Sequence, residues 1–418
     1  MTVATQDTTL HTIVNMIKGE RLSELIQAYG GDRYCKSLSV QKMLIAMVIG
    51  ILKGMKSLRD IECFTEDCAE ELREVGVDRI ARSSLADRLK RTNPAILKGF
   101  FESLRGEYEK RLSKPSKEEF KLLLMDSTMI EVPLSQVNWA RYSRTKGAIK
   151  MHTVLKHGPQ EEHPVQMVLT DGKTADVTIA EQELEVDSDS IFVADRGYAS
   201  KRLFNKIAKL NGTFVIRIKS KTYYHLVNTR IRTLGEDSPP LDEEVTLERR
   251  NIFDPRQLRF RRLVLPPFEG HKKPIVLLTN DFTRTAAEIG EIYRRRWRIE
   301  LFFKWLKQHL HLSTFIGFSR NAVENQIYIA LILALLLAYL HSLVQNARAL
   351  TPYTLFRHLR NRLFQRYNLI EALFGGSRHP STTDNYPRLY PITLFIHLNV
   401  PRTPMPRPGP NFTPPLAG

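Results

Sequence analysis

Residues 293–312 read YRRRWRIELFFKWLKQHLHL and combine a single acidic residue with many basic and aromatic side chains. A helix advances about 100° per residue, so five of these residues would share a stripe roughly 80° wide: Tyr293, Arg296, Glu300, Lys304 and Lys307. Salt bridges on a solvated helix surface are the ordinary explanation for such a pattern. The aromatic side chains at 297, 302, 303 and 305 favour instead a helix that is buried or that offers a stacking surface.

Two aspartates end apolar runs further towards the N-terminus. Asp126 follows LLLM and Asp195 follows IFVA, and continuous apolar runs of this length are typical of strands buried on both faces of a sheet. A carboxylate at the tip of a buried strand is costly unless it is paired, hydrogen-bonded or metal-bound. Each aspartate could instead cap the turn that follows it. Because ligands gather at the carboxyl ends of strands, the two together predict an acidic site at one edge of a sheet.

Residues 1–112 read as short helices, and their starts are marked by polar residues or proline: Ser39, Ser57, Ser83 or Ser84, and Pro94. Gly54 is expected to end the first of these helices. Short helices joined by turns are compatible with helix-turn-helix DNA binding, and an ordinary bundle with solvated basic faces explains them equally well. We interpret this part as a helical DNA-binding domain.

The rest of the chain is expected to form an α/β core followed by a C-terminal segment. Residues 113–345 contain six strand-like runs, a β-rich insertion at about 221–285 and then one long helix, roughly 286–312. Residues 346–418 begin as a helical segment and end in a proline-rich tail, which we expect to be extended.

The overall charge favours polyanionic partners. Among 418 residues, 62 are Lys or Arg and 45 are Asp or Glu, which gives a net charge of +17. The longest apolar run, 327–340, is shorter than the about 20 residues that span a membrane, so it predicts a buried core helix and no membrane partner. The first residues, MTVATQDTTLHTIV, lack the pattern of a secretory signal. We therefore expect a cytoplasmic protein, with nucleic acid as the leading candidate partner.

The spacing Tyr293-x2-Arg296-x3-Glu300-x6-Lys307 resembles the Y-R-E-K signature of bacterial insertion-sequence transposases with a DDE active site. Five further stretches are similar to that family and occur in its order: LLLMDSTMIEV, GAIKMHTVL, MVLTDGKTADVTIA, VADRGYAS and FVIRIKS. The resemblance is close over about residues 120–345 and loose over the helical N-terminus.

This resemblance implies an RNase H-like core, with Asp126 on its first strand, Asp195 after its fourth and Glu300 on a helix after the insertion. The three acids would be the catalytic residues and would bind two Mg²⁺ or Mn²⁺ ions, which prefer oxygen ligands. By the same analogy, basic and aromatic side chains would contact DNA: Tyr293, Arg296, Lys307, Lys304 and Arg196.

The resemblance further implies a DNA transposase that binds double-stranded terminal inverted repeats, cleaves there and transfers the 3′-OH end to target DNA, working as a homodimer. Two alternatives stay open: an RNase H-like nuclease without strand transfer, and a catalytically inactive DNA-binding derivative. Relatives that cut through a hairpin place a Trp in the insertion. Residues 221–285 contain none, so Tyr223, Tyr224 or Phe253 would have to stack a flipped base instead.

Two further polar features are explained without catalysis. Asp171 and Asp176 in TDGKTAD form a rival acid pair, but solvated side chains at a Gly172 turn account for them more simply. His152 alternates with apolar neighbours on a predicted strand, which favours a hydrogen-bonded structural histidine. Lys150 would share its face and could reach DNA.

Overall fold

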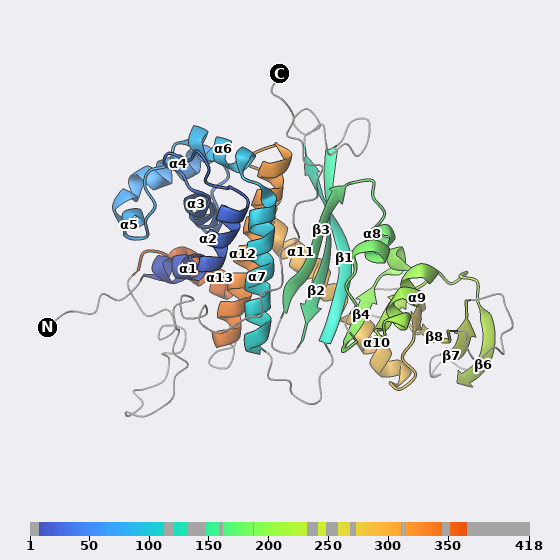
Figure 1. Cartoon of the computed structure of the whole chain (residues 1–418). Helices are drawn as coiled ribbons and strands as arrows, with labels where there is room; N and C mark the ends of the chain where they lie inside the picture. Colours follow the sequence, from blue (N-terminus) through green and yellow to red (C-terminus); the bar gives the residue numbers. More distant parts are fainter. Residues whose placement is uncertain are drawn as a thin grey trace, which may run out of the picture.

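The computed structural model describes residues 8–112, 121–132, 147–158, 162–186, 188–231, 241–247, 258–267, 273–310, 312, 315–344 and 352–365. A helical body occupies one end of the molecule and a nine-stranded sheet with its own helices occupies the other (Figure 1). The predicted proline-rich tail lies outside the described residues.

The N-terminal part is helical, as predicted, and contains seven helices among the described residues: α1 (Thr9–Ile17), α2 (Glu20–Ala28), α3 (Val40–Lys53), α4 (Leu58–Asp67), α5 (Ala69–Glu74), α6 (Arg82–Arg91) and α7 (Pro94–Leu112). Ser39 caps α3 by accepting from Lys42 N, and Gly54 ends it at a φ of 78°. Ser57 opens α4 with a capping box. The predicted cap of α6 is wrong, because that helix begins at Arg82 and both serines lie in its first turn.

Helix α12 (Arg320–Val344) joins the helical body to the sheet. It packs against α3, α6, α7 and β3, and against α13 (Pro352–Asn361). It is long and apolar enough to cross a membrane, but 83% of its apolar window is buried inside the fold. This is the buried core helix that the apolar run 327–340 predicts.

The strand order is β3-β2-β1-β4-β5-β9-β8-β7-β6, with these bounds: β1 (Lys121–Val132), β2 (Gly147–His157), β3 (Glu162–Asp171), β4 (Ser190–Ala194), β5 (Thr213–Arg217), β6 (His225–Ile231), β7 (Leu241–Thr246), β8 (Phe260–Leu265) and β9 (Ile275–Thr279). Strands β1 to β3 are antiparallel, and β4 and β5 follow in parallel with β1. The first five strands therefore have the RNase H-like arrangement. The β-rich insertion extends the same sheet, because β9 pairs antiparallel with β5.

Helices cover both faces of this sheet. Helices α8 (Asp176–Glu183) and α9 (Lys201–Lys209) pack on one face, and α10 (Ala286–Arg294), α11 (Trp297–His309) and α12 pack on the other. Side chains alternate between the two: Leu122 and Leu124 lie in the core under α10 to α12, whereas Leu123 and Met125 lie in the core under α8 and α9. The single helix predicted over 286–312 is two helices, α10 and α11, separated by a turn at Arg295 and Arg296.

Candidate active site

Asp126 and Asp195 occupy neighbouring positions on two adjacent parallel strands. The pairing of β1 with β4 runs from Lys121–Ser190 to Met125–Ala194, so the two aspartates are the next residues on each strand. By alternation both point to the face covered by α10 and α11. Asp126 is not at a strand tip as predicted, because β1 continues to Val132. It lies where the short strand β4 ends and leaves one edge of β1 open.

Backbone amides hold one oxygen of each aspartate. Ser127 N donates to Asp126 Oδ1 at 2.8 Å, and Gly197 N donates to Asp195 Oδ1 at 2.7 Å, where Asp195 caps the short 3₁₀ helix η2 (Arg196–Tyr198). Burial raises the pKa of Asp126 to about 6, although the Ser127 hydrogen bond and the Arg296 charge oppose this shift. The capping that we considered as an ordinary explanation is therefore present, but at Asp126 it accompanies a strongly desolvated carboxylate.

Arg296 joins Asp126 to Glu300. Its Nη1 lies 3.5 Å from Asp126 Oδ2, and its Nη2 donates to Glu300 Oε1 at 2.5 Å. The predicted i,i+4 salt bridge between Arg296 and Glu300 thus exists, but the Arg296 side chain is only 15% exposed and also reaches the sheet. The third acid is brought to the edge where the two aspartates lie, with the guanidinium between them.

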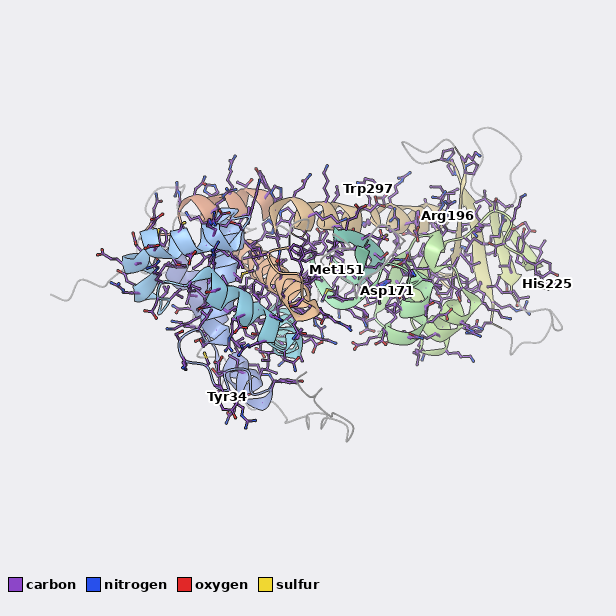
Figure 2. All side chains as sticks on the ribbon, turned by 90° about the horizontal axis from the view of Figure 1, so that it is seen from above. Tyr34, Met151, Asp171, Arg196, His225 and Trp297 are labelled. Carbon is purple, nitrogen blue, oxygen red and sulfur yellow. The ribbon has the colours of Figure 1, made fainter. Side chains whose placement is uncertain are left out.

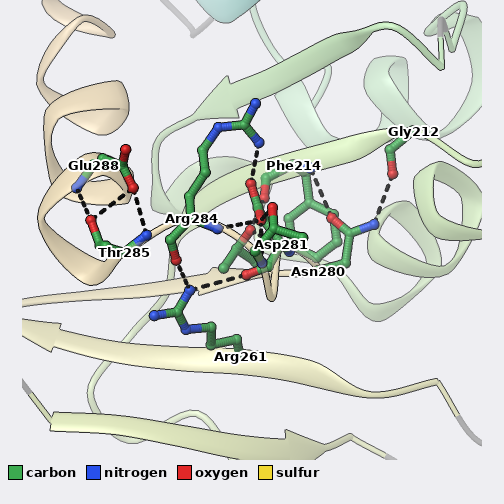
Figure 3. A network of polar contacts seen from close by, with 10 residues as sticks. Gly212, Phe214, Arg261, Asn280, Asp281, Arg284, Thr285 and Glu288 are labelled. Carbon is green, nitrogen blue, oxygen red and sulfur yellow. Dashed lines mark hydrogen bonds and ion pairs between the residues drawn. The ribbon is translucent and has the colours of Figure 1, made fainter. Parts of the chain in front are cut away.

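A polar network fixes the start of the helix pair that carries Glu300 (Figure 3). Arg261 on β8 pairs with Asp242 and donates to the carbonyls of Asp281 and Arg284. Asp281 in turn accepts from the backbone N of Arg284 at 3.1 Å. Thr285 then opens α10 with a capping box. Strands β7 and β8 of the insertion therefore anchor the loop that leads to Arg296 and Glu300.

Comparison with known proteins agrees with this arrangement. Residues 117–337 match the family model described as the transposase DDE domain, and residues 5–78 match a domain of unknown function, DUF4372. The chain belongs to the transposase DDE domain family. This transposase family acts on DNA and generally depends on divalent metal ions.

Three relatives carry the name of a transposase. One, y4zB of Sinorhizobium fredii, is 30% identical over 65% of this chain and 76% of its own length. The transposase named for insertion sequence element IS5377 of Geobacillus stearothermophilus is 23% identical over 80% of this chain and 85% of its own. The one named for IS4SA of Synechocystis is 25% identical over 62% and 71%.

The predicted DNA-contacting residues of the transposase divide into two groups. Two of them are partly or fully buried. The ring centre of Tyr293 lies 6.0 Å from the guanidinium carbon of Arg296. Lys307 Nζ donates to the Met129 carbonyl of β1 at 2.8 Å. Lys304 and Arg196 are exposed. The stripe predicted for one straight helix is interrupted, because Arg296 N bonds to Tyr293 O, three residues back, and tightens the turn before α11.

Figure 2 shows Arg196 and Trp297 in the middle of the molecule, between Tyr34 in the helical body and His225 at the far end of the sheet. Trp297 is 56% exposed. Of the aromatic residues considered for the insertion, Tyr223 is 65% exposed, whereas the Tyr224 ring lies 4.8 Å below the guanidinium of Arg262. Phe253 lies outside the described residues.

The opposite face of the sheet carries a polar cluster that the sequence interpretation underrated. Asp171 is exposed and caps its own turn by accepting from Lys173 N and Thr174 N, as expected. Asp176 differs: its Oδ1 lies 3.2 Å from His152 Nδ1 and 3.4 Å from Lys150 Nζ. Lys150, which we expected to be able to reach DNA, donates instead to the Thr174 carbonyl and is only 12% exposed.

Tyr198 lies at the border of this cluster. It is 4% exposed, and burial followed by the charges of Asp176, Asp126 and Asp195 raises the pKa of its phenol well above the usual value. The tyrosine therefore lies within electrostatic reach of acids on both faces. The motif DRGY contains it, but nothing in its sequence pattern separates a buried site residue from an ordinary core aromatic.

The carboxylates can be tested as ligands for a hard divalent cation. Among the residues that the structure describes, no three His, Cys, Asp or Glu side chains already form a group that could hold a metal. Asp126 and Asp195 are adjacent and on one face, and the Arg296 guanidinium shows that the space between Asp126 and Glu300 accepts a positive charge. The donor set fits Mg²⁺ or Mn²⁺, with Glu300 at present paired to Arg296.

Proposed function

We propose that this insertion-sequence transposase cleaves the ends of its element and transfers the resulting 3′-OH ends to target DNA, in cut-and-paste transposition. The observation that carries the proposal is the placement of Asp126 beside Asp195 on one sheet edge, with Glu300 joined to Asp126 through Arg296. The membership of the chain in the transposase DDE domain family supports the same reaction.

In this proposal Asp126, Asp195 and Glu300 hold two Mg²⁺ or Mn²⁺ ions. When bound, such ions activate the attacking oxygen and stabilise the leaving oxygen in an in-line displacement at phosphorus. The protein supplies the geometry: the Ser127 and Gly197 amides fix one oxygen of each aspartate, and the second oxygen of Asp126 faces the Arg296 guanidinium, which a metal ion would have to displace. The desolvation that raises the pKa of Asp126 would be relieved by a bound cation.

The basic side chains beside the acids would hold the DNA. The planar guanidinium of Arg296 suits a phosphate through two parallel hydrogen bonds, and Lys307 acts as a point charge beside β1. Tyr293 supports the guanidinium from below, at 6.0 Å from its ring centre. The exposed Lys304 and Arg196 would extend the contact along the backbone of the duplex.

The other parts of the chain have complementary roles in this proposal. The helices of residues 1–112 would bind the terminal inverted repeats, and two subunits would bring two ends together as a homodimer. The reaction requires access to chromosomal DNA, so we place the protein in the cytoplasm, at the nucleoid. The division at residues 113 and 346 remains a prediction, since α12 contributes to the core of the helical body.

Labelled DNA containing the element's ends, incubated with the full chain and Mg²⁺, tests the proposal. A transposase produces joined strands, an RNase H-like nuclease only cleaved strands, and an inactive derivative only a bound complex. Asp126→Ala, Asp195→Ala and Glu300→Ala should each abolish cleavage while end binding persists. Cleavage near the wild-type rate by any one of these variants contradicts the assignment of the three acids.

A further inference from the structure

Ser127 connects the catalytic edge with the opposite face of the sheet. Its backbone N donates to Asp126 Oδ1 at 2.8 Å. Its side chain points the other way, because successive residues of β1 alternate between the faces. There it faces Asp176, the first residue of α8, and the Ser127 hydroxyl is one of the groups that lower the pKa of that carboxyl. One residue thus lies between two acids on opposite faces of the sheet.

Two side chains of β2 lie beside the Asp176 carboxylate. His152 is the cross-strand partner of Ser127 on β2, and its Nδ1 lies 3.2 Å from Asp176 Oδ1. The Lys150 ammonium lies 3.4 Å from the same oxygen. The other ring nitrogen of His152 is bonded to Thr170 Oγ1 at 2.9 Å, so the ring cannot turn freely. Asp176 is therefore directed at Ser127 by groups from β2 and β3.

The charge on Asp176 persists over the whole physiological range. Burial alone would raise its pKa, but the contacts with His152, Ser127 and Lys150 outweigh burial and lower the pKa to about 2. Asp171, five residues earlier, is exposed, and its carboxylate accepts hydrogen bonds from Lys173 and Thr174 of its own turn. The two acids of TDGKTAD therefore differ in their surroundings: Asp171 is a solvated turn residue, whereas Asp176 lies beside Lys150 and His152 of β2.

We propose that Asp176 is a positioning residue of the catalytic centre, which acts through Ser127 to fix the direction of the Asp126 carboxylate. Lys150 and His152 keep Asp176 in place. This inference rests on the proposed function, because it treats Asp126 as a metal ligand. Outer partners of metal-ligating carboxylates typically contribute about 10–100-fold to metal affinity or activity.

A purely structural role for Asp176 has a different signature. An acid in the first turn of α8 also stabilises that helix through its dipole. Loss of that effect would lower the melting temperature and leave the metal affinity unchanged. The affinity for Mn²⁺, measured without DNA, therefore separates the two roles and does not depend on activity.

The test uses the full chain with Asp176→Asn, Ser127→Ala, the double variant, and Asp171→Asn as the matched control. We expect Asp176→Asn and Ser127→Ala each to weaken Mn²⁺ binding about tenfold in calorimetric titration. The double variant should bind Mn²⁺ as tightly as the weaker-binding single variant, because both changes break the same connection from Asp176 through Ser127 to Asp126. Asp171→Asn should bind Mn²⁺ as the wild type does.

Wild-type Mn²⁺ affinity in folded Asp176→Asn or in Ser127→Ala overturns the inference, as do additive losses in the double variant. If Asp176→Asn does not fold, Ser127→Ala decides alone. Asp126→Ala in the same titration separates this result from the proposed function. If Asp126→Ala binds Mn²⁺ as the wild type does, both proposals are wrong. If Asp126→Ala loses Mn²⁺ binding and Asp176→Asn keeps the wild-type affinity, only the positioning role is wrong.

Discussion

The guanidinium of Arg296 lies beside the carboxylate of Asp126, with 3.5 Å between Nη1 and Oδ2. The same group donates to Glu300, so one positive charge separates two acids that we propose as metal ligands. The carboxylates of Asp126 and Glu300 repel each other, and a cation between them lowers that repulsion. Arg296 therefore occupies, in the free protein, a position that favours a cation, and it must compete with any metal ion for the same oxygens.

Replacing Arg296 by Gln should change metal binding and catalysis in opposite directions. Without DNA, the variant should bind Mn²⁺ more tightly, because the competing guanidinium is gone. Cleavage should nevertheless fall at least about tenfold, since a charge-assisted hydrogen bond to phosphate contributes about 1.5–3 kcal/mol. Calorimetry with Mn²⁺ and single-turnover cleavage of labelled ends measure the two effects.

Arg298→Gln is the matched control for this experiment. Arg298 lies two residues further on, is 47% exposed and pairs with Glu162 at 2.8 Å, away from the acids. Its replacement should leave Mn²⁺ affinity unchanged. Weaker Mn²⁺ binding in Arg296→Gln would contradict the competition, because it would mean that the guanidinium supports the metal site.

Metal binding should depend on pH through Asp126. Its pKa of about 6 means that, below pH 6, the metal-free site is mainly protonated and a cation must displace the proton. Mn²⁺ affinity should therefore fall about tenfold per pH unit below 6 and level off above 7. Titrations at pH 5, 6, 7 and 8 would show this, and equal affinities at pH 5 and pH 7 would exclude Asp126 as the titrating ligand.

Local signals in the sequence predicted the elements that obey local rules. Ser39 and Ser57 cap their helices and Pro94 begins α7, because each of these depends on a few neighbouring backbone groups. The cap of α6 was predicted wrongly at Ser83 or Ser84, since that helix begins at Arg82 and its N-cap residue is Ala81, which has no capping side chain. The RNase H-like core followed from the resemblance, and the first five strands of the sheet have that arrangement.

The parts of the site that depend on long-range pairing were harder to predict. Asp126 seemed to end a strand, and only the pairing with the five-residue strand β4 shows why it lies inside β1 yet at an open edge. Asp176 looked like a solvated turn acid, because its partners Lys150 and His152 are more than twenty residues away in the chain. Sequence periodicity does not report such cross-strand contacts.

Asp126 should lower the stability of the free protein at neutral pH. Its folded-state pKa of about 6 exceeds the usual 3.8, so the folded protein favours the protonated form. The corresponding stability is present below about pH 4 and is lost as pH rises through 6. Asp126→Asn should therefore raise the free energy of unfolding by about 1–3 kcal/mol at pH 8, with little change at pH 4.

Urea denaturation at the two pH values, without added metal, measures this effect. Asp171→Asn provides the control, because the pKa of Asp171 is lowered by the hydrogen bonds of its turn, so its replacement should reduce stability at pH 8. A lower stability of Asp126→Asn at pH 8 would show that the carboxylate is better stabilised by its neighbours than burial suggests.

Lys307 should contribute one phosphate contact. Lys307→Ala is expected to weaken end binding and to reduce the slope of log K against log salt by about one unit. Because Lys307 Nζ also donates to Met129 O, the variant should lose about 0.5–1.5 kcal/mol of stability. Lys304→Ala, one turn away and exposed, should change the salt slope without that loss of stability. Binding isotherms between 50 and 200 mM salt, about the range in which such contacts are resolved, distinguish the two.

The connection between α12 and α6 should matter for folding and not for chemistry. Asn325 is fully buried, and its amide donates to the carbonyls of Leu89 and Thr92 at 3.1 and 2.9 Å. Asn325→Leu leaves both carbonyls without this donor. A buried polar group without a hydrogen-bond partner costs about 1–3 kcal/mol, so the variant should be less stable by about that amount. Asn321→Leu, one turn earlier and half-buried with a single bond to Lys90 O, should cost less. Thermal unfolding measures both, and Mn²⁺ affinity should be unchanged in each, because Glu300 is anchored through α10 and the β7–β8 network.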